Sequence, residues 1–160
     1  MRSNDNSQSK VVRYSNGKEC QTIQYDEEDK PLYSGNTKIK GLCASFINEN
    51  RNLDICVADS RAKSVVVVNQ SGKLRFRYTG HPSEAKRNPF KPFGITTNSL
   101  GQILTADHNN HCIHILDKDG QFLFYIDDVI DSYGLCIDRY DMLFVTEYTT
   151  GNVKVIKYFE

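Results

Sequence analysis

Three stretches of this chain repeat one pattern, and the repeat limits the possible fold more than any other feature of the sequence. Each stretch begins at a glycine and continues into a short apolar run that ends in an acidic residue. The glycine and the acid are 13 residues apart in the second and third stretches and 18 in the first, which predicts a five-residue loop insertion at residues 48–52. The aligned glycines are Gly41, Gly94 and Gly134, and the acids are Asp59, Asp107 and Glu147.

Each stretch contains further short runs rich in β-branched and aromatic residues. A third run follows each acid, at residues 65–68, 113–116 and 153–156, and a fourth, aromatic run follows a Gly turn in the first two stretches. Such runs are typical of strands, and no segment keeps the 3.6-residue apolar period of a helix. A unit of about 40 residues with four strands is one blade of a β-propeller, which must stack on its neighbours to bury both faces. The sequence therefore predicts an all-β fold of four-stranded antiparallel blades.

The strand count predicts about half of a six-bladed ring. We expect two strands at the N-terminal end, four in each of two blades and three in the last, whereas six four-stranded blades need about 24. Open blade faces and edge strands tend to pair, so self-association is expected unless upstream sequence completes the ring. The expected divisions are a disordered tail at 1–9 and a repeat region at 10–160, made of a partial blade and linker at 10–37, blades at 38–80 and 90–128, and a blade lacking its last strand at 132–160.

Charge and cysteine content limit the partners and the compartment. The net charge is zero, which does not favour a chain dominated by nucleic-acid binding. The charge is nevertheless uneven, because residues 38–91 hold eleven Lys/Arg and four Asp/Glu, whereas residues 101–160 hold four and ten. No segment has the pattern of a secretory signal or the length of a membrane span, so no membrane partner is expected. Five cysteines without a CxxC pair favour reduced thiols and a cytoplasmic protein.

The second stretch resembles the NHL repeat, a unit of β-propellers named for an Asn-His-Leu signature. The matching residues include 92–95, Asp107 and the pair Asn110 and His111, with Cys112 in place of the signature Leu. The first and third stretches keep the glycine, the acid and the strand pattern. The resemblance implies a partial NHL-type propeller over roughly residues 10–160.

Three segments are more narrowly similar to the C-terminal propellers of tripartite-motif NHL proteins, especially those of invertebrates. These segments are residues 54–59, 94–97 and 103–107. The resemblance implies a non-catalytic module that selects a protein substrate, or an RNA, for an E3 ubiquitin ligase. The zinc-binding RING that transfers ubiquitin in that family is not part of these 160 residues, so no catalytic residue is expected here. The alternatives are an RNA-binding propeller acting in post-transcriptional regulation and a calcium-dependent propeller hydrolase, for which the sequence shows no converging acids and amides.

A partner-binding surface is expected where loops meet on one face of the propeller. Loops between the second and third strands of each blade, and connections between blades, share that face. Basic groups beside aromatic rings can hold a phosphate backbone and stack a base, or anchor an acidic peptide. Phe90 and Phe93 have the alternative of packing between blades. The predicted partner-binding residues are Arg61, Lys63, Arg87, Lys91, Phe93, His108, Asn109 and Tyr148.

Residues 108–114 contain three His and one Cys, the composition of a metal-binding cluster. In a strand that begins near Cys112, side chains alternate faces, so Cys112 and His114 point one way and His111 the other. Two groups are fewer than the three or four ligands that zinc needs, so neither a metal nor another cofactor is predicted. We assign the repeated glycines and acids, with Asn110 and His111, to the fold, because a recurring acid is better explained as an acceptor for turn amides.

Overall fold

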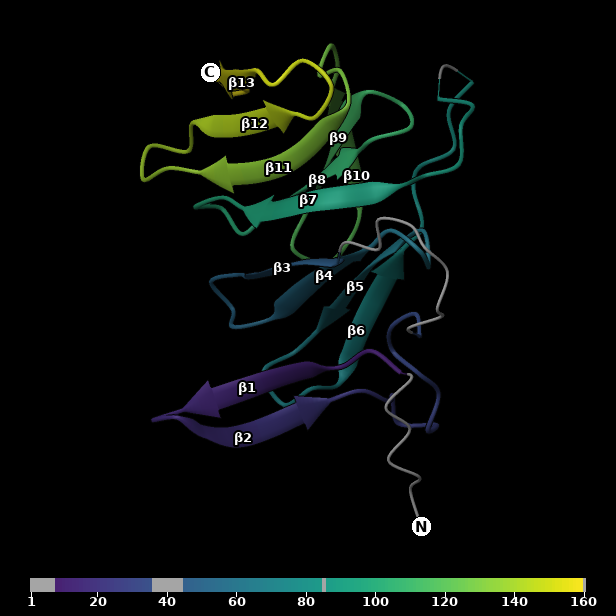
Figure 1. Cartoon of the computed structure of the whole chain (residues 1–160), viewed down its shortest axis with the longest axis vertical. Helices are drawn as coiled ribbons and strands as arrows, with labels where there is room; N and C mark the ends of the chain where they lie inside the picture. The colour runs from purple at the N-terminus through teal and green to yellow at the C-terminus, as the bar shows by residue number, and fades with distance from the viewer. Residues whose placement is uncertain (1–7, 36–44, 85, 160) are drawn as a thin grey trace.

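The chain forms 13 strands over residues 8–35, 45–84 and 86–159, which are the residues that the computed structural model describes (Figure 1). Gly41 lies outside these ranges. Within them no helix suited to crossing a membrane is found. In chain order the strands are β1 (Val11–Ser15), β2 (Lys18–Ile23), β3 (Ser45–Glu49), β4 (Ile55–Asp59), β5 (Ser64–Val68), β6 (Leu74–Tyr78), β7 (Pro92–Thr97), β8 (Ile103–Asp107), β9 (Cys112–Leu116), β10 (Phe122–Ile126), β11 (Ser132–Ile137), β12 (Leu143–Glu147) and β13 (Val153–Ile156).

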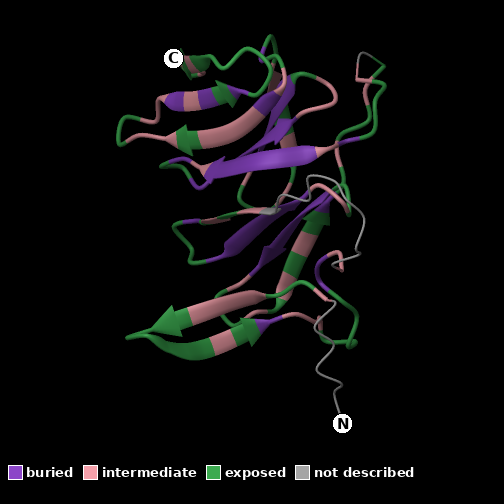
Figure 2. Ribbon diagram, viewed as in Figure 1, coloured by how far each residue is buried: buried purple, intermediate pink, exposed green. Residues whose placement is uncertain are grey.

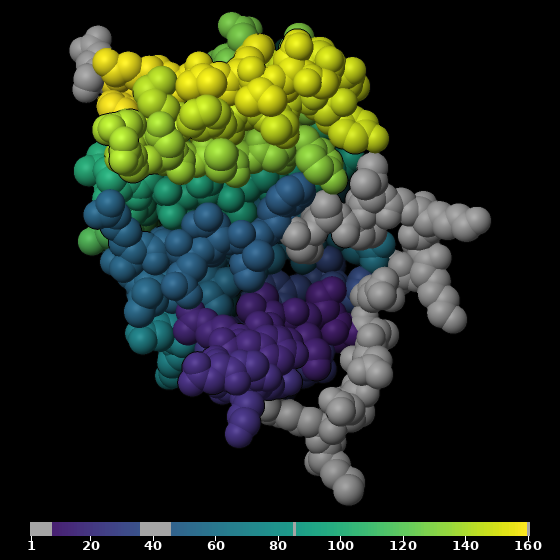
Figure 3. Space-filling model, turned by 60° about the vertical axis from the view of Figure 1, so that its left-hand side comes forward, coloured from purple at the N-terminus to yellow at the C-terminus, as the bar shows by residue number. Residues whose placement is uncertain are grey.

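The strands form four antiparallel sheets, each made of strands consecutive in the chain. The sheets are β1–β2, β3–β6, β7–β10 and β11–β13. They stack in chain order, so that β1–β2 and β11–β13 lie at opposite ends (Figures 1 and 3). The first strands of the three larger sheets, β3, β7 and β11, lie side by side, with β7 between the other two. We call these three the inner strands. The expected fold class, an all-β partial propeller with four-stranded antiparallel blades, is confirmed.

The same side-chain turn closes six loops, among them the hairpin loops β3–β4, β5–β6, β7–β8, β9–β10 and β11–β12. In each, one Asn or Asp oxygen accepts the backbone N–H groups two and four residues further on, an arrangement that only short polar side chains make easily. This satisfies the amides of a five-residue loop without using the strand ladder. The residues are Asp26, Asn50, Asn69, Asn98, Asp117 and Asp138.

The expected insertion at residues 48–52 is wrong. The loop that begins at Asn50 has the same turn and the same length as those that begin at Asn98 and Asp138. Residues 48 and 49 belong to β3 itself, paired without interruption to β4. The extra residues of the first stretch therefore precede β3, and aligning the stretches on glycines misplaced this blade.

The three blades align correctly when residues are matched by their cross-strand partners. Ser45, Pro92 and Ser132 each pair with the acid at the end of the neighbouring strand. The next residue of each inner strand is Phe46, Phe93 or Tyr133, so these three rings occupy the same position in three blades. In β7 and β11 a register shift follows, which contains Gly94 and Gly134, whereas β3 pairs continuously. No residue of β3 corresponds to these two glycines.

The apolar cores lie between the sheets rather than inside one. Along β4, Cys56 and Ala58 pack toward β7–β10, whereas Ile55 and Val57 pack toward β1–β2. The middle strands of the complete blades are buried along their whole length, whereas the outer strand β6 alternates and the outer strand β10 is only partly buried (Figure 2). Burial of both faces explains why the middle strands read as continuous apolar runs instead of alternating ones.

This packing predicts which cysteines react. Burial raises the pKa of the Cys56 thiol to about 12, and its side chain is fully buried, whereas Cys20 is exposed. Because the thiolate is the reactive form, iodoacetamide at neutral pH is expected to modify Cys20 and to leave Cys56 intact. Peptide mapping by mass spectrometry measures this, and guanidinium should make both sites reactive. Modification of Cys56 at the rate of Cys20 in the native protein would contradict the packing.

Candidate binding site on the inner strands

Four aromatic rings form a continuous row at one end of the inner strands; we call them the aromatic ladder: Phe46, Phe93, Tyr133 and Tyr148. The Phe93 and Tyr133 rings stack at 5.0 Å between centroids, and Phe46 meets both edge-on at 6.3 and 5.3 Å. Tyr148 continues the row, 5.5 Å from Tyr133. The ladder forms because three inner strands carry an aromatic residue at one register position, and neighbouring blades bring those positions together.

The rings of the ladder differ in exposure, and the ladder ends in an exposed ring. Phe93 is 3% exposed, Phe46 and Tyr133 are half-buried, and Tyr148 is 60% exposed. Ile130 is 50% exposed and lies near the exposed end, since it precedes Asp131, whose carbonyl accepts the Tyr148 N–H. The exposed end therefore offers an apolar surface supported by packed rings.

A cation and an imidazole lie against the ladder. The Lys91 ammonium is 5.3 Å from the centroid of the Phe93 ring, within the range of a cation–π interaction. The His108 ring meets Phe93 edge-on at 5.1 Å, and its Nδ1 is buried with no hydrogen-bond partner. Aromatic faces beside a cation suit recognition of apolar and acidic side chains.

The repeated acids hold the loops around the ladder. Asp59 accepts hydrogen bonds from the Ser34 N–H and hydroxyl and from the Ala62 N–H. Asp107 accepts from the Lys91 N–H and the Asn110 amide. Each carboxylate thus joins two segments of the chain. One precedes the first strand of its blade, and the other is the loop that follows the second strand of that blade.

Two of these acids stay ionised at neutral pH. Burial would raise the pKa of Asp107, but His114, Asn110 and the Lys91 N–H lower it below the ordinary value. Hydrogen bonds from Lys154 and Thr150 lower the pKa of Glu147. Both therefore remain acceptors for the loop groups at physiological pH.

The structure brings together four of the eight predicted partner-binding residues. Lys91, Phe93 and His108 are in mutual contact, and Tyr148 joins them through Tyr133. The other four face different surroundings and are not part of the ladder. Arg61 donates to the Gly35 carbonyl, Arg87 to the Glu84 carbonyl and Asn109 to the Pro89 carbonyl, and Lys63 is exposed in a left-handed backbone conformation.

Sequence reasoning missed Phe46 and Tyr133. Tyr133 precedes Gly134 as Phe93 precedes Gly94, a signal that could have found it. Phe46 was hidden by the misplaced insertion. Among residues assigned to the fold, Asn110 exchanges two hydrogen bonds with the Asn88 backbone, and His111 Nδ1 accepts the Asp131 N–H.

Comparisons with known proteins agree with this architecture. One protein family matches the sequence, described as the NHL repeat, over residues 91–116, which run from β7 to β9 and include part of the ladder. No curated protein sequence matches the chain.

Solved propeller structures are similar in fold. A catalytically inactive virginiamycin B lyase from Staphylococcus aureus with Quinupristin has a TM-score of 0.59 and 14% identity, and the match covers 98% of this chain and 58% of that one. The structure of U3-55K has a TM-score of 0.61 and 12% identity, and the match covers 93% of this chain and 46% of that one. The WD40 repeats of RRP9 have a TM-score of 0.57 and 13% identity, and the match covers 93% of this chain and 45% of that one. The chain spans about half the length of these structures.

Together these observations define the class of protein as part of a β-propeller. Within that class, the chain carries an NHL repeat in the blade β7–β10. The similar structures include a lyase as well as WD40 repeats, so the propeller fold alone does not decide between catalysis and binding.

Proposed function

We propose that this chain is a non-catalytic propeller module that binds a polypeptide through the exposed end of the aromatic ladder. The observation that carries the proposal is the row from Phe93 through Tyr133 to Tyr148, which ends in a ring that is 60% exposed. A tyrosine fixed by packed neighbours loses little entropy on binding, and such residues supply much of the affinity of protein interfaces. Lys91 beside the ladder favours an acidic side chain in the partner.

The contacts of the basic residues favour a polypeptide over RNA. Phosphate binding needs Lys and Arg side chains directed to the ligand. Arg61 and Arg87 donate to backbone carbonyls, and Lys86 is paired with Asp127. Base stacking needs free ring faces, but Phe93 and Tyr133 stack on each other. RNA binding is therefore the competing outcome of the test.

We further propose that the partner is a substrate of a tripartite-motif ubiquitin ligase, with this chain as the substrate-recognition part. The support is the resemblance of residues 54–59, 94–97 and 103–107 to that family, together with the NHL repeat at residues 91–116. The cytoplasm is the compartment that we assign, and the four free cysteines among the described residues agree with it. Self-association stays a prediction; its surface would include the exposed Val153 and Val155 of β13.

The test begins with a peptide library displayed on phage and selected against the purified chain. Peptides that bind are then measured against Tyr148→Ala and against Tyr140→Ala. Tyr140 is a matched control because it is 64% exposed but lies in the loop between β11 and β12, at the opposite ends of the strands. We expect Tyr148→Ala to weaken binding about 30-fold, the loss typical of an aromatic anchor. Tyr140→Ala should bind as the wild type does.

Two results would reject the proposal. Equal affinities of the two variants would show that the ladder is not the binding site. Tight binding of single-stranded RNA that falls by a factor of about 1000 between about 50 and 200 mM salt, without any selected peptide, would favour the RNA function instead.

A further inference from the structure

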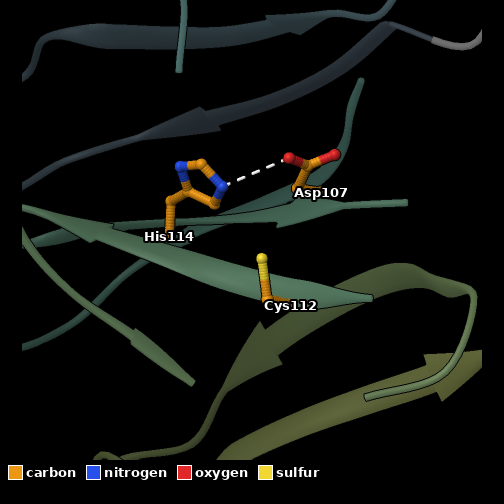
Figure 4. A group of neighbouring side chains, drawn as sticks. All are labelled: Asp107, Cys112 and His114. Atoms are coloured by element: carbon orange, nitrogen blue, oxygen red, sulfur yellow. Dashed lines mark ion pairs between the residues drawn. The ribbon is translucent and has the colours of Figure 1, made fainter. Parts of the chain in front are cut away.

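Three metal-ligating side chains converge on one face of the blade β7–β10. Asp107 is the register partner of Cys112, and His114 follows two residues later on β9. Register partners share a face and side chains alternate along a strand, so all three point the same way. Figure 4 shows the three side chains directed toward one another. Their ligand atoms lie within 4.8 Å of one another, and all three residues are buried.

Two polar atoms on this face are buried without a hydrogen-bond partner. His114 Nδ1 is 2.7 Å from the Tyr78 hydroxyl, but Nε2, 3.2 Å from Asp107 Oδ2, lacks hydrogen-bond geometry. The hydroxyl of Thr105, the register partner of His114, is also unpartnered. A buried polar atom without a partner is costly, and a bound ion or water molecule would satisfy it.

We propose that Asp107, Cys112 and His114 bind a zinc ion. Thiolate, imidazole and carboxylate together form a donor set that selects Zn²⁺ over Ca²⁺ or Mg²⁺. Bond lengths of about 2.0–2.3 Å in a tetrahedral site separate the donor atoms by about 3.3–3.6 Å. The Nε2–Oδ2 distance of 3.2 Å is close to this, and the Cys112 Sγ needs a shift on the order of 1 Å. The thiol proton leaves to solvent as the zinc–sulfur bond forms.

The surroundings supply support and access. The Tyr78 hydroxyl orients the His114 ring, and the Asn110 amide holds the Asp107 carboxylate, the kind of outer contacts that metal ligands use. A pocket of about 360 Å³ between the blades is lined by Asp107 and His114, so an ion can enter and a water molecule can take the fourth position. Lys86 also lines this pocket, but its charge is paired with Asp127.

The first test measures thermal unfolding of the chelator-treated chain with and without Zn²⁺. At a hundredfold excess over the dissociation constant, binding should raise the Tm by about 8 °C. Cys112→Ser and His114→Gln should each lose most of that shift. His111→Gln removes an exposed imidazole nearby and should keep it, which separates the cluster from surface binding. An equal shift in Cys112→Ser and the wild type would overturn the proposal.

The second test does not depend on the folding of variants. Co²⁺ replaces Zn²⁺ in thiolate sites and gives visible bands, intense when the site is tetrahedral, and a near-ultraviolet band from the thiolate. Titration of the chelator-treated wild type with Co²⁺ should produce both, saturating at one ion per chain and abolished by Zn²⁺. A Co²⁺ titration without the thiolate band would overturn the proposal.

Discussion

Gly94→Ala is expected to lower the free energy of unfolding by about 3 kcal/mol. A Cβ at this position would lie 2.5 Å from the Tyr133 carbonyl oxygen and 2.7 Å from the Leu135 nitrogen, both backbone atoms of β11. Backbone cannot move aside as a flexible side chain can, so the two inner strands must separate. Urea unfolding followed by far-ultraviolet circular dichroism measures the change. Because β7 and β11 carry the stacked rings of the ladder, the substitution should also weaken peptide binding.

Gly151→Ala is the matched control for this prediction. Gly151 has a φ of 70°, so alanine is strained there, but nothing lies within 4 Å of an added Cβ. The expected cost is about 1 kcal/mol, from backbone strain alone. If Gly94→Ala costs no more than Gly151→Ala, the inner strands do not approach as closely as the structure shows.

Leu104→Ala is expected to cost about 4 kcal/mol, the second large effect. Leu104 is fully buried in the core between β7–β10 and β11–β13, together with Ile113 and Leu143. The truncation leaves a cavity between blades, where two sheets would have to move to close it. Thermal or urea unfolding measures the loss.

Leu100→Ala provides the comparison for Leu104. Leu100 lies in the loop just before β8 and is 76% exposed, so its truncation should change the free energy of unfolding by less than about 0.5 kcal/mol. Equal effects at the two leucines would show that the sheets do not stack in solution.

The strands could be predicted because their pattern repeats. Runs such as residues 65–68 and 113–116 are rich in apolar and β-branched residues, and turns of Asn, Asp and Gly separate them, so strand type and order follow from local chemistry. The exact alignment of the blades could not be predicted in this way. The repeated glycine was a weaker guide than the acid, because glycine marks a bulge that only β7 and β11 possess, whereas the acid marks a strand end that all three blades share.

The candidate sites depended on contacts between strands, which a single sequence does not show. Lys91, Phe93, His108 and Tyr148 were predicted from their loops, but Phe46 became part of the ladder only through register. The cluster of three side chains was missed for the same reason. Alternation along one strand identified Cys112 and His114, and the third group, Asp107, comes from the strand beside it. Pairing each acid with its cross-strand partner would have found it.

The most direct test of the binding site uses a single fluorescent probe. The chain contains no Trp, so Tyr148→Trp places its one indole at the exposed end of the ladder and Tyr140→Trp places it in the loop at the opposite ends of the strands. Titration with a selected peptide should shift the emission of the indole at position 148 to shorter wavelength, with saturation, and should leave the emission of the indole at 140 unchanged. A saturable shift at 140 with none at 148 would contradict the account and place the partner on the other face.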